Sequence, residues 1–196
     1  MRVERAFKTF GCVAIALASL PPMTVSAQAT QQSKGLTPAL VATRAALDKY
    51  KDPLQAVRDG YFSTVACLAY PGMSHDGMKP GAMGVHFLNP ANIGPTLDSL
   101  KPQALMYEPV GDKLVLVGAE WFVPVAVSKE PPTIFGQTLS GPMEGHEPIM
   151  PESLQHWDLH VWLWKDNPSG VFSATNPSVK CPSTFGYSYD DGKLKR

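Results

Sequence analysis

The distribution of proline and glycine beyond Tyr61 is the feature of this sequence that most constrains its fold. From that residue onward, prolines and glycines separate apolar runs that are short and rich in Val, Phe, Tyr and Trp. Proline breaks helices and glycine weakens them, whereas β-branched and aromatic residues suit extended strands. The pattern therefore predicts strands joined by turns. The predicted strands lie near residues 63–69, 83–88, 104–108, 113–127 and 156–164.

The connections between these strands also carry local signals. Val110-Gly111-Asp112 predicts a hairpin turn, and Pro124 is predicted to end or bend the long strand because it cannot donate to a sheet ladder. Residues 128–155 are rich in proline and glycine and are expected to form a long loop without regular structure. Loops of this kind often cover or form binding sites.

Two helix starts precede the strands. Thr37-Pro38 and Asp52-Pro53 each place an N-cap residue directly before a proline at the first helical position, and Gly60 is expected to end the second helix. The predicted fold class is α+β, with two N-terminal helices packed on an antiparallel β-sheet or small curled barrel. The first helix carries an amphipathic pattern over Leu40, Val41, Arg44, Leu47 and Tyr50, and the second is predicted to turn Leu54, Val57 and Tyr61 inward.

The first residues are typical of a secretory leader. A basic segment with Arg2, Arg5 and Lys8 precedes a short apolar run, and small residues follow it at Ala27 and Ala29. We therefore expect a signal peptide over 1–27, a disordered lead-in over 28–36, and a single α+β domain over 37–196. Cleavage after Ala29 is the alternative. The leader predicts a periplasmic or secreted location.

Charge and hydropathy narrow the range of partners. Loss of the leader would remove three basic residues and one acidic residue from the 17 of each, leaving a net charge near −2. No basic surplus remains to attract nucleic acid or anionic lipid, and no later apolar run approaches the ~20 residues of a membrane helix. We expect a small molecule or metal ion as the partner, with no nucleic acid and no membrane after cleavage. The sequence leaves open whether the chain forms a homo-oligomer.

Two of the three cysteines lie beyond the leader, namely Cys67 and Cys181. An even number of cysteines in an oxidising compartment predicts a disulfide between them. Thiolate ligation of a soft metal is the alternative, although no CxxC pair is present.

The segment HWDLHVWLW, residues 156–164, carries the main chemical signal. As a strand it would place Trp157, Leu159, Val161 and Leu163 on one face. The other face would carry His156, Asp158, His160, Trp162 and Trp164. Residues four apart on a strand are separated by ~13 Å, so the two histidines are not expected to share one ion. Asp158 lies close enough to His160 either to share one ion with it or to orient it, in the way that carboxylates support metal-bound imidazoles.

Three further residues complete a predicted site. His86 lies on a predicted strand, Glu120 lies on an otherwise apolar strand, and His146 lies in the long loop beside Glu147. Together with His160, they offer nitrogen and oxygen ligands of the kind that bind Zn, Fe, Mn or Cu. A metal-free acid–base site is the alternative, with His86, Glu120 and His160 as the catalytic candidates. Polar residues on the wet face of a sheet are the simplest explanation.

A second pattern suggests copper. Methionine and histidine alternate in MSHDGMKPGAMGVH and again in PMEGHEPIM, and thioether with imidazole suits Cu(I). Methionines that fill gaps in a core would produce the same pattern. The residues concerned are Met73, His75, Met78, Met83, His86, Met143, His146 and Met150.

Several motifs resemble a group of secreted bacterial proteins of unknown function. They are GAMGVHFLNP, ALMYEP, LVGAEWFVP, FGQTLSGPMEGHEP and DLHVWLWKDNPSG, spread over about residues 61–182. The resemblance implies one domain and no particular activity. Any site of that group would draw on the residues within the motifs, which are His86, Glu120, His146, Glu147, Asp158 and His160.

The sequence therefore predicts a secreted or periplasmic domain with a His/Glu pocket for a metal ion or small ligand. The pocket is a candidate active site as well as a binding site. A periplasmic copper carrier with Met/His ligands is one alternative. A structural or interaction domain, with apolar strands at an oligomer interface and no active site, is the other.

Overall fold

The structure of the chain is a computed structural model. It describes residues 35–70, 79–145, 150–151 and 153–182, and the backbone alone of 187–190 and 193–195. The predicted leader therefore lies outside the described residues, as do Met73, His75, Met78, His146 and Glu147.

The N-terminal helical segment begins where its caps predict. Helix α2 (Pro38–Leu47) continues through the 3-10 turn η1 (Asp48–Lys51), and α3 (Pro53–Arg58) follows. The Thr37 side chain accepts a hydrogen bond from the Leu40 amide, and Asp52 accepts one from the Leu54 amide. These bonds satisfy amides that have no partner within the first helical turn.

The predicted inward face of α3 is wrong. Leu54 and Val57 are exposed, whereas Ala56 is fully buried and Tyr61 is buried as expected. A helix of six residues is too short for periodicity to identify its buried side. The small Ala56 side chain is the one that faces the core.

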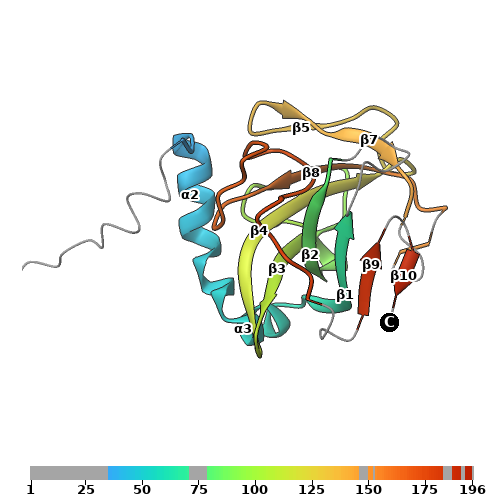
Figure 1. The fold of residues 1–196 in the computed structure, drawn as a ribbon. Helices are drawn as coiled ribbons and strands as arrows, with labels where there is room; N and C mark the ends of the chain where they lie inside the picture. The colour runs from blue at the N-terminus through green and yellow to red at the C-terminus, as the bar shows by residue number, and fades with distance from the viewer. Residues whose placement is uncertain are drawn as a thin grey trace, which may run out of the picture.

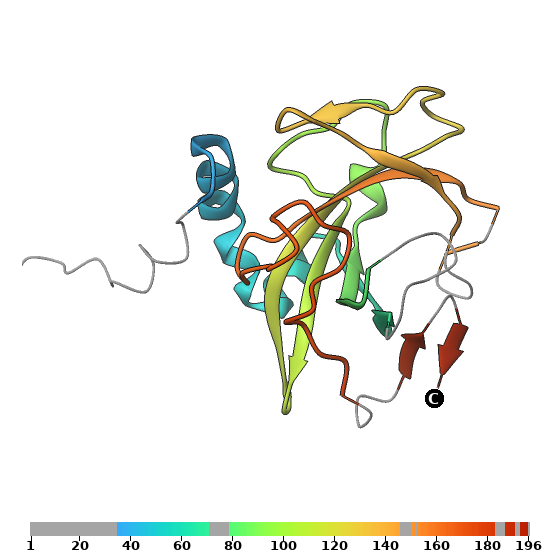
Figure 2. The same ribbon diagram turned by 45° about the horizontal axis from the view of Figure 1, so that its top comes forward.

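Eight strands form one curled sheet (Figures 1 and 2). Its order is β10-β9-β1-β2-β3-β4-β8-β7, with antiparallel pairing between neighbours except for the parallel pair β1 and β9. The strands are β1 (Phe62–Tyr70), β2 (Gly81–Leu88), β3 (Ala104–Val110), β4 (Lys113–Pro124), β7 (Ser140–Met143), β8 (His156–Val161), β9 (Tyr187–Asp190) and β10 (Lys193–Lys195).

The α+β class and the curled sheet are thus confirmed, with differences in detail. Strand β4 ends at Pro124, and β8 ends at Val161 rather than continuing to 164. The connection 128–155 is not free of regular structure, because it contains β7 and the small hairpin of β5 (Thr133–Ile134) and β6 (Gln137–Thr138). These strands have two to four residues, which is too short for alternation to be detected. A 3-10 turn, η2 (Pro90–Asn92), follows β2.

The two faces of the sheet bury different kinds of side chain. One face packs its apolar residues against the helical segment, with Leu40 and Leu47 in the same cluster as Trp121 and Leu159. Helix α2 lies beside the sheet on the side away from β9 and β10 (Figure 1). Because strand residues alternate between faces, the residues next to Trp121 and Leu159 lie on the other face. That face holds the polar residues considered below.

The predicted disulfide is present. Cys67 of β1 is bonded to Cys181. It joins the first strand to the segment that follows β8, across 114 residues of sequence. Among the described residues, no helix is both long enough and apolar enough to cross a bilayer.

Gly84 permits the close approach of β2 and β3. Its φ is +86°, and a Cβ atom built there would lie 2.4 Å from the Tyr107 carbonyl oxygen. We expect Gly84→Ala to lower the free energy of unfolding by about 2 kcal/mol or more, because neither backbone can move aside cheaply. Urea denaturation measures this. Gly94→Ala is the matched control, since a Cβ there meets nothing within 4 Å. Equal midpoints for the two variants would contradict the prediction.

Candidate metal centre

Strand pairing places the candidate residues on one face of the sheet. Glu120 of β4 is paired with Ala104 of β3 on one side and with His160 of β8 on the other. His86 of β2 is paired with Met106, two residues along β3 from Ala104. Paired residues point to the same face, as do residues two apart. His86, Glu120 and His160 therefore share a face although they lie far apart in sequence.

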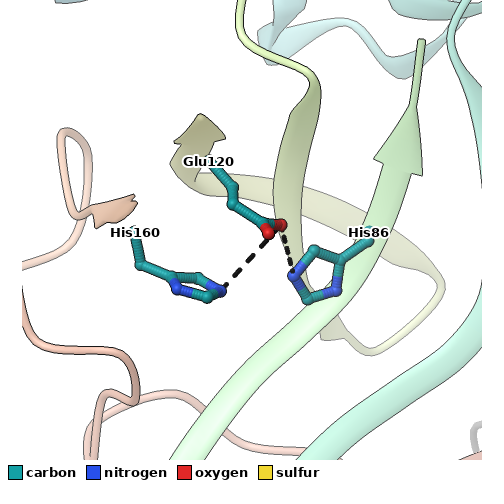
Figure 3. A group of neighbouring side chains, drawn as sticks. All are labelled: His86, Glu120 and His160. Carbon is teal, nitrogen blue, oxygen red and sulfur yellow. Dashed lines mark ion pairs between the residues drawn. The ribbon is translucent and has the colours of Figure 1, made fainter. Parts of the chain in front are cut away.

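The curl of the sheet brings these side chains into contact. His86 Nε2 lies 3.3 Å from Glu120 Oε2, and His160 Nε2 lies 4.0 Å from the same oxygen. Figure 3 shows the two imidazoles on either side of the carboxylate. Between β2 and β4, the β3 residue Ala104 is paired with Leu88 on one side and with Glu120 on the other. His160 Nδ1 lies 3.3 Å from Asp158 Oδ2, as the strand alternation predicted.

Burial makes it costly for the side chains of this cluster to carry a charge. His86, Glu120, His156, Asp158 and His160 are all at least nine-tenths buried. Desolvation, with a contribution from the Asp158 charge, raises the pKa of Glu120 well above its ordinary range. Burial raises the pKa of Asp158 to about 7, and it lowers the pKa of His156. A cation bound between the carboxylates would offset the cost of their ionisation.

The cluster borders a small cavity. The cavity has a volume of about 40 Å³, and the described residues that line it include no Lys or Arg. Since one water molecule needs ~10–15 Å³, the cavity has room for an ion with a few waters. It is far below the ~300–1,000 Å³ of pockets for organic ligands. Its lining includes Thr64, Met83, Met150 and the three histidines.

His156 was left out of the predicted ligand set, yet the structure places it beside the others. It forms a group with Glu120 and Asp158 in which the ligand atoms lie within 4.8 Å of one another. Its position two residues before Asp158, on the same strand face, was the available signal. Thr64 also lines the cavity, and no sequence pattern marked it.

The copper pattern is brought together only in part. Met83 and Met150 line the cavity, whereas Met143 is not among its lining residues and packs against the small apolar cluster that contains Met83. The remaining residues of that pattern, apart from His86, lie outside the described residues.

The donor set is typical of a metal centre. His86, Glu120 and His160 offer ligand atoms within 4.8 Å of one another. Two imidazoles and one carboxylate are the ligands of many catalytic zinc and non-haem iron sites, in which water or substrate occupies the remaining positions. Comparisons of the chain with protein-family models, curated proteins and solved structures found no match.

Proposed function

We propose that this chain is an extracytoplasmic metal-binding protein that holds a divalent first-row transition metal between His86, Glu120 and His160. The supporting observation is the convergence of two imidazoles on one carboxylate, all three buried, beside a cavity of the size of a hydrated ion. Asp158 would accept the Nδ1 proton of His160 and so leave Nε2 free to bind metal. The disulfide is compatible with an oxidising compartment, and the predicted leader supports a periplasmic or secreted location.

The donor set also permits catalysis. Three protein ligands leave coordination positions for water, which a bound metal ion would activate as a nucleophile. Without a metal, the same histidines and Glu120 could exchange protons as an acid–base pair. We place metal binding first because it accounts for buried carboxylates that have no Lys or Arg among the described residues lining the cavity.

The copper carrier is the second candidate. Met83 and Met150 line the same cavity as the histidines, and thioethers favour Cu(I). The two buried carboxylates favour harder divalent ions instead, which is why copper is placed second.

Metal analysis of the purified protein tests these candidates. The chain is stripped with a chelator, dialysed, and titrated separately with Zn²⁺, Mn²⁺, Fe²⁺ and Cu(I), the last in a competition assay. Stoichiometric binding of a divalent ion, with at least one ion per chain lost in His86→Ala and in His160→Ala, supports the proposal. Cu(I) binding that is tighter than Zn²⁺ binding and is lost in Met83→Leu would favour the carrier. A protein that binds none of these ions, and is as stable after both histidine substitutions, would favour the structural class.

Metal binding is expected to strengthen from about pH 5 to about pH 8. Protonated carboxyls and imidazolium cannot ligate a metal, so the ion must displace protons held by Asp158 and Glu120. The pKa of Asp158 is about 7 in the folded chain against an ordinary 3.8. Its contribution to metal-free stability is therefore present below about pH 4 and is lost as the pH rises through about 7. His156 acts in the opposite sense, because its lowered pKa makes its contribution disappear as the pH falls.

Thermal unfolding with and without Zn²⁺ measures this pH dependence. The increase in Tm caused by the metal should be larger at the alkaline end of the range. A metal-induced increase that is constant across the range, or larger at the acid end, would contradict the assignment of carboxylate ligands.

A further inference from the structure

The pocket contains more ligands than one ion needs. Besides the group of His86, Glu120 and His160, a second group is formed by Glu120, His156 and Asp158, again with ligand atoms within 4.8 Å of one another. All five side chains are buried and line the same cavity. The two groups share Glu120.

We infer that the pocket is a two-metal centre in which Glu120 bridges one ion held by His86 and His160 and a second ion held by His156 and Asp158. This inference rests on the proposed function and extends it from one ion to two. The ligand class is a pair of divalent first-row ions such as Zn²⁺ or Mn²⁺, which prefer imidazole and carboxylate together.

Strand geometry explains why two ions are needed to use all five ligands. His156 and His160 are four residues apart on β8, so their backbones are separated by ~13 Å. One ion with bonds of about 2 Å cannot easily be reached by both imidazoles. Glu120 is paired with His160, yet its carboxylate also lies within 4.8 Å of the ligand atoms of His156 and Asp158. A carboxylate has two oxygens and can bind both ions at the ~3.5–4 Å separation of two-metal sites.

His156 is held in the form that binds metal. Its Nδ1 lies 3.2 Å from the backbone carbonyl oxygen of Leu154. A carbonyl oxygen only accepts, so Nδ1 carries the proton and Nε2 carries the lone pair. Donation of the second ring nitrogen to a backbone carbonyl is the usual arrangement of metal-bound histidines. A histidine with only a packing role does not require this orientation.

Thr64 provides a further, independent indication. Its hydroxyl is buried, lines the cavity, and has no hydrogen-bond partner among the described residues. Buried hydroxyls are costly without a partner, so a bound water or hydroxide is expected there. Five protein ligands leave open positions on two ions, and the cavity has space for a few waters to fill them. A metal-bound water within reach of Thr64 satisfies both requirements.

The number of bound ions separates this inference from the function on which it rests. Chelator-treated protein is loaded with excess Mn²⁺, freed of unbound ion, and analysed for metal per chain and by electron paramagnetic resonance. Two ions per chain with an exchange-coupled spectrum are expected. One ion per chain with an isolated-ion spectrum would leave the proposed function standing and overturn the two-metal centre. No bound Mn²⁺ would overturn the two-metal centre, and failure to bind any of the ions titrated above would overturn both.

Conservative variants test the assignment of ligands to each ion. Asp158→Asn and His156→Gln are expected to retain one ion per chain and to convert the coupled spectrum to that of an isolated ion. His86→Gln should likewise retain one ion, held by the other group. Circular dichroism confirms that each variant is folded, and the wild-type spectrum gives a result that depends on no variant. Two ions retained in Asp158→Asn and His156→Gln together would overturn the assignment.

Discussion

Glu120→Gln is expected to abolish metal binding while leaving the metal-free fold at least as stable as the wild type. Glutamine has the size of glutamate but lacks the charge that both ligand groups share at this position. The dissociation constant should rise by more than about 100-fold, beyond the ~10–100-fold cost of altering an outer partner of a metal ligand. The metal-free protein is expected to lose no stability, because burial raises the pKa of Glu120 and so disfavours the ionised form that glutamine cannot adopt.

This combination distinguishes a binding role from a structural one. A glutamate kept for stability would lower the unfolding free energy when replaced, with no effect on bound metal. Isothermal titration with Zn²⁺ and urea denaturation of the metal-free protein measure the two quantities. Unchanged affinity in Glu120→Gln would remove the carboxylate from the site.

Glu108→Gln is the matched control for this experiment. Glu108 is also a buried glutamate on the same sheet, but it is paired with Lys165 and accepts a hydrogen bond from the Lys180 amide. Its replacement should lower stability by about 1–3 kcal/mol, because the Lys165 ammonium loses its charged partner. Metal affinity should not change. Glu120→Gln is therefore expected to lose metal binding but not stability, and Glu108→Gln to lose stability but not metal binding.

Removal of the disulfide is expected to have the largest effect on stability. Cys67 and Cys181 close a loop across 114 residues, and a loop of this length restricts the unfolded chain by about 4–5 kcal/mol in the chain-entropy account. The double variant Cys67→Ser with Cys181→Ser should lose most of this amount. Cys67 lies in the apolar core and Cys181 packs against it, so the serine hydroxyls add a cost of their own.

The disulfide prediction is checked by urea denaturation under two redox conditions. The wild-type midpoint should fall on addition of a thiol reductant towards that of the double variant, whose own midpoint should not respond. A wild-type midpoint that is the same with and without reductant, while the cysteines are shown to be reduced, would contradict it. Metal loading should be compared in the same samples, because β1 carries both Cys67 and the cavity residue Thr64.

The predicted site was partly accessible to reasoning from sequence. Alternation along β8 placed Asp158 and His160 on one side, and the structure has them 3.3 Å apart. His86 and Glu120 were chosen only because they are polar residues in apolar strands. Their approach depends on the order of β2, β3 and β4 and on the register of each pair, which no local pattern specifies. His156 is not in the predicted ligand set because residues four apart on a strand, such as His156 and His160, do not easily reach one ion. That distance does not exclude ligation of two separate ions.

Local chemistry determined what the sequence alone could predict. The Thr37-Pro38 and Asp52-Pro53 helix starts depend on hydrogen bonds within a few residues, and the hairpin turn after Val110 depends on its own glycine. The disulfide followed from there being only two cysteines beyond the leader. Tertiary structure decided which side of α3 is buried, where the short strands of 128–155 pair, and how the curl of the sheet joins His86 to Glu120. These features depend on contacts between segments distant in sequence, and such contacts are set by packing and strand register rather than by neighbouring residues.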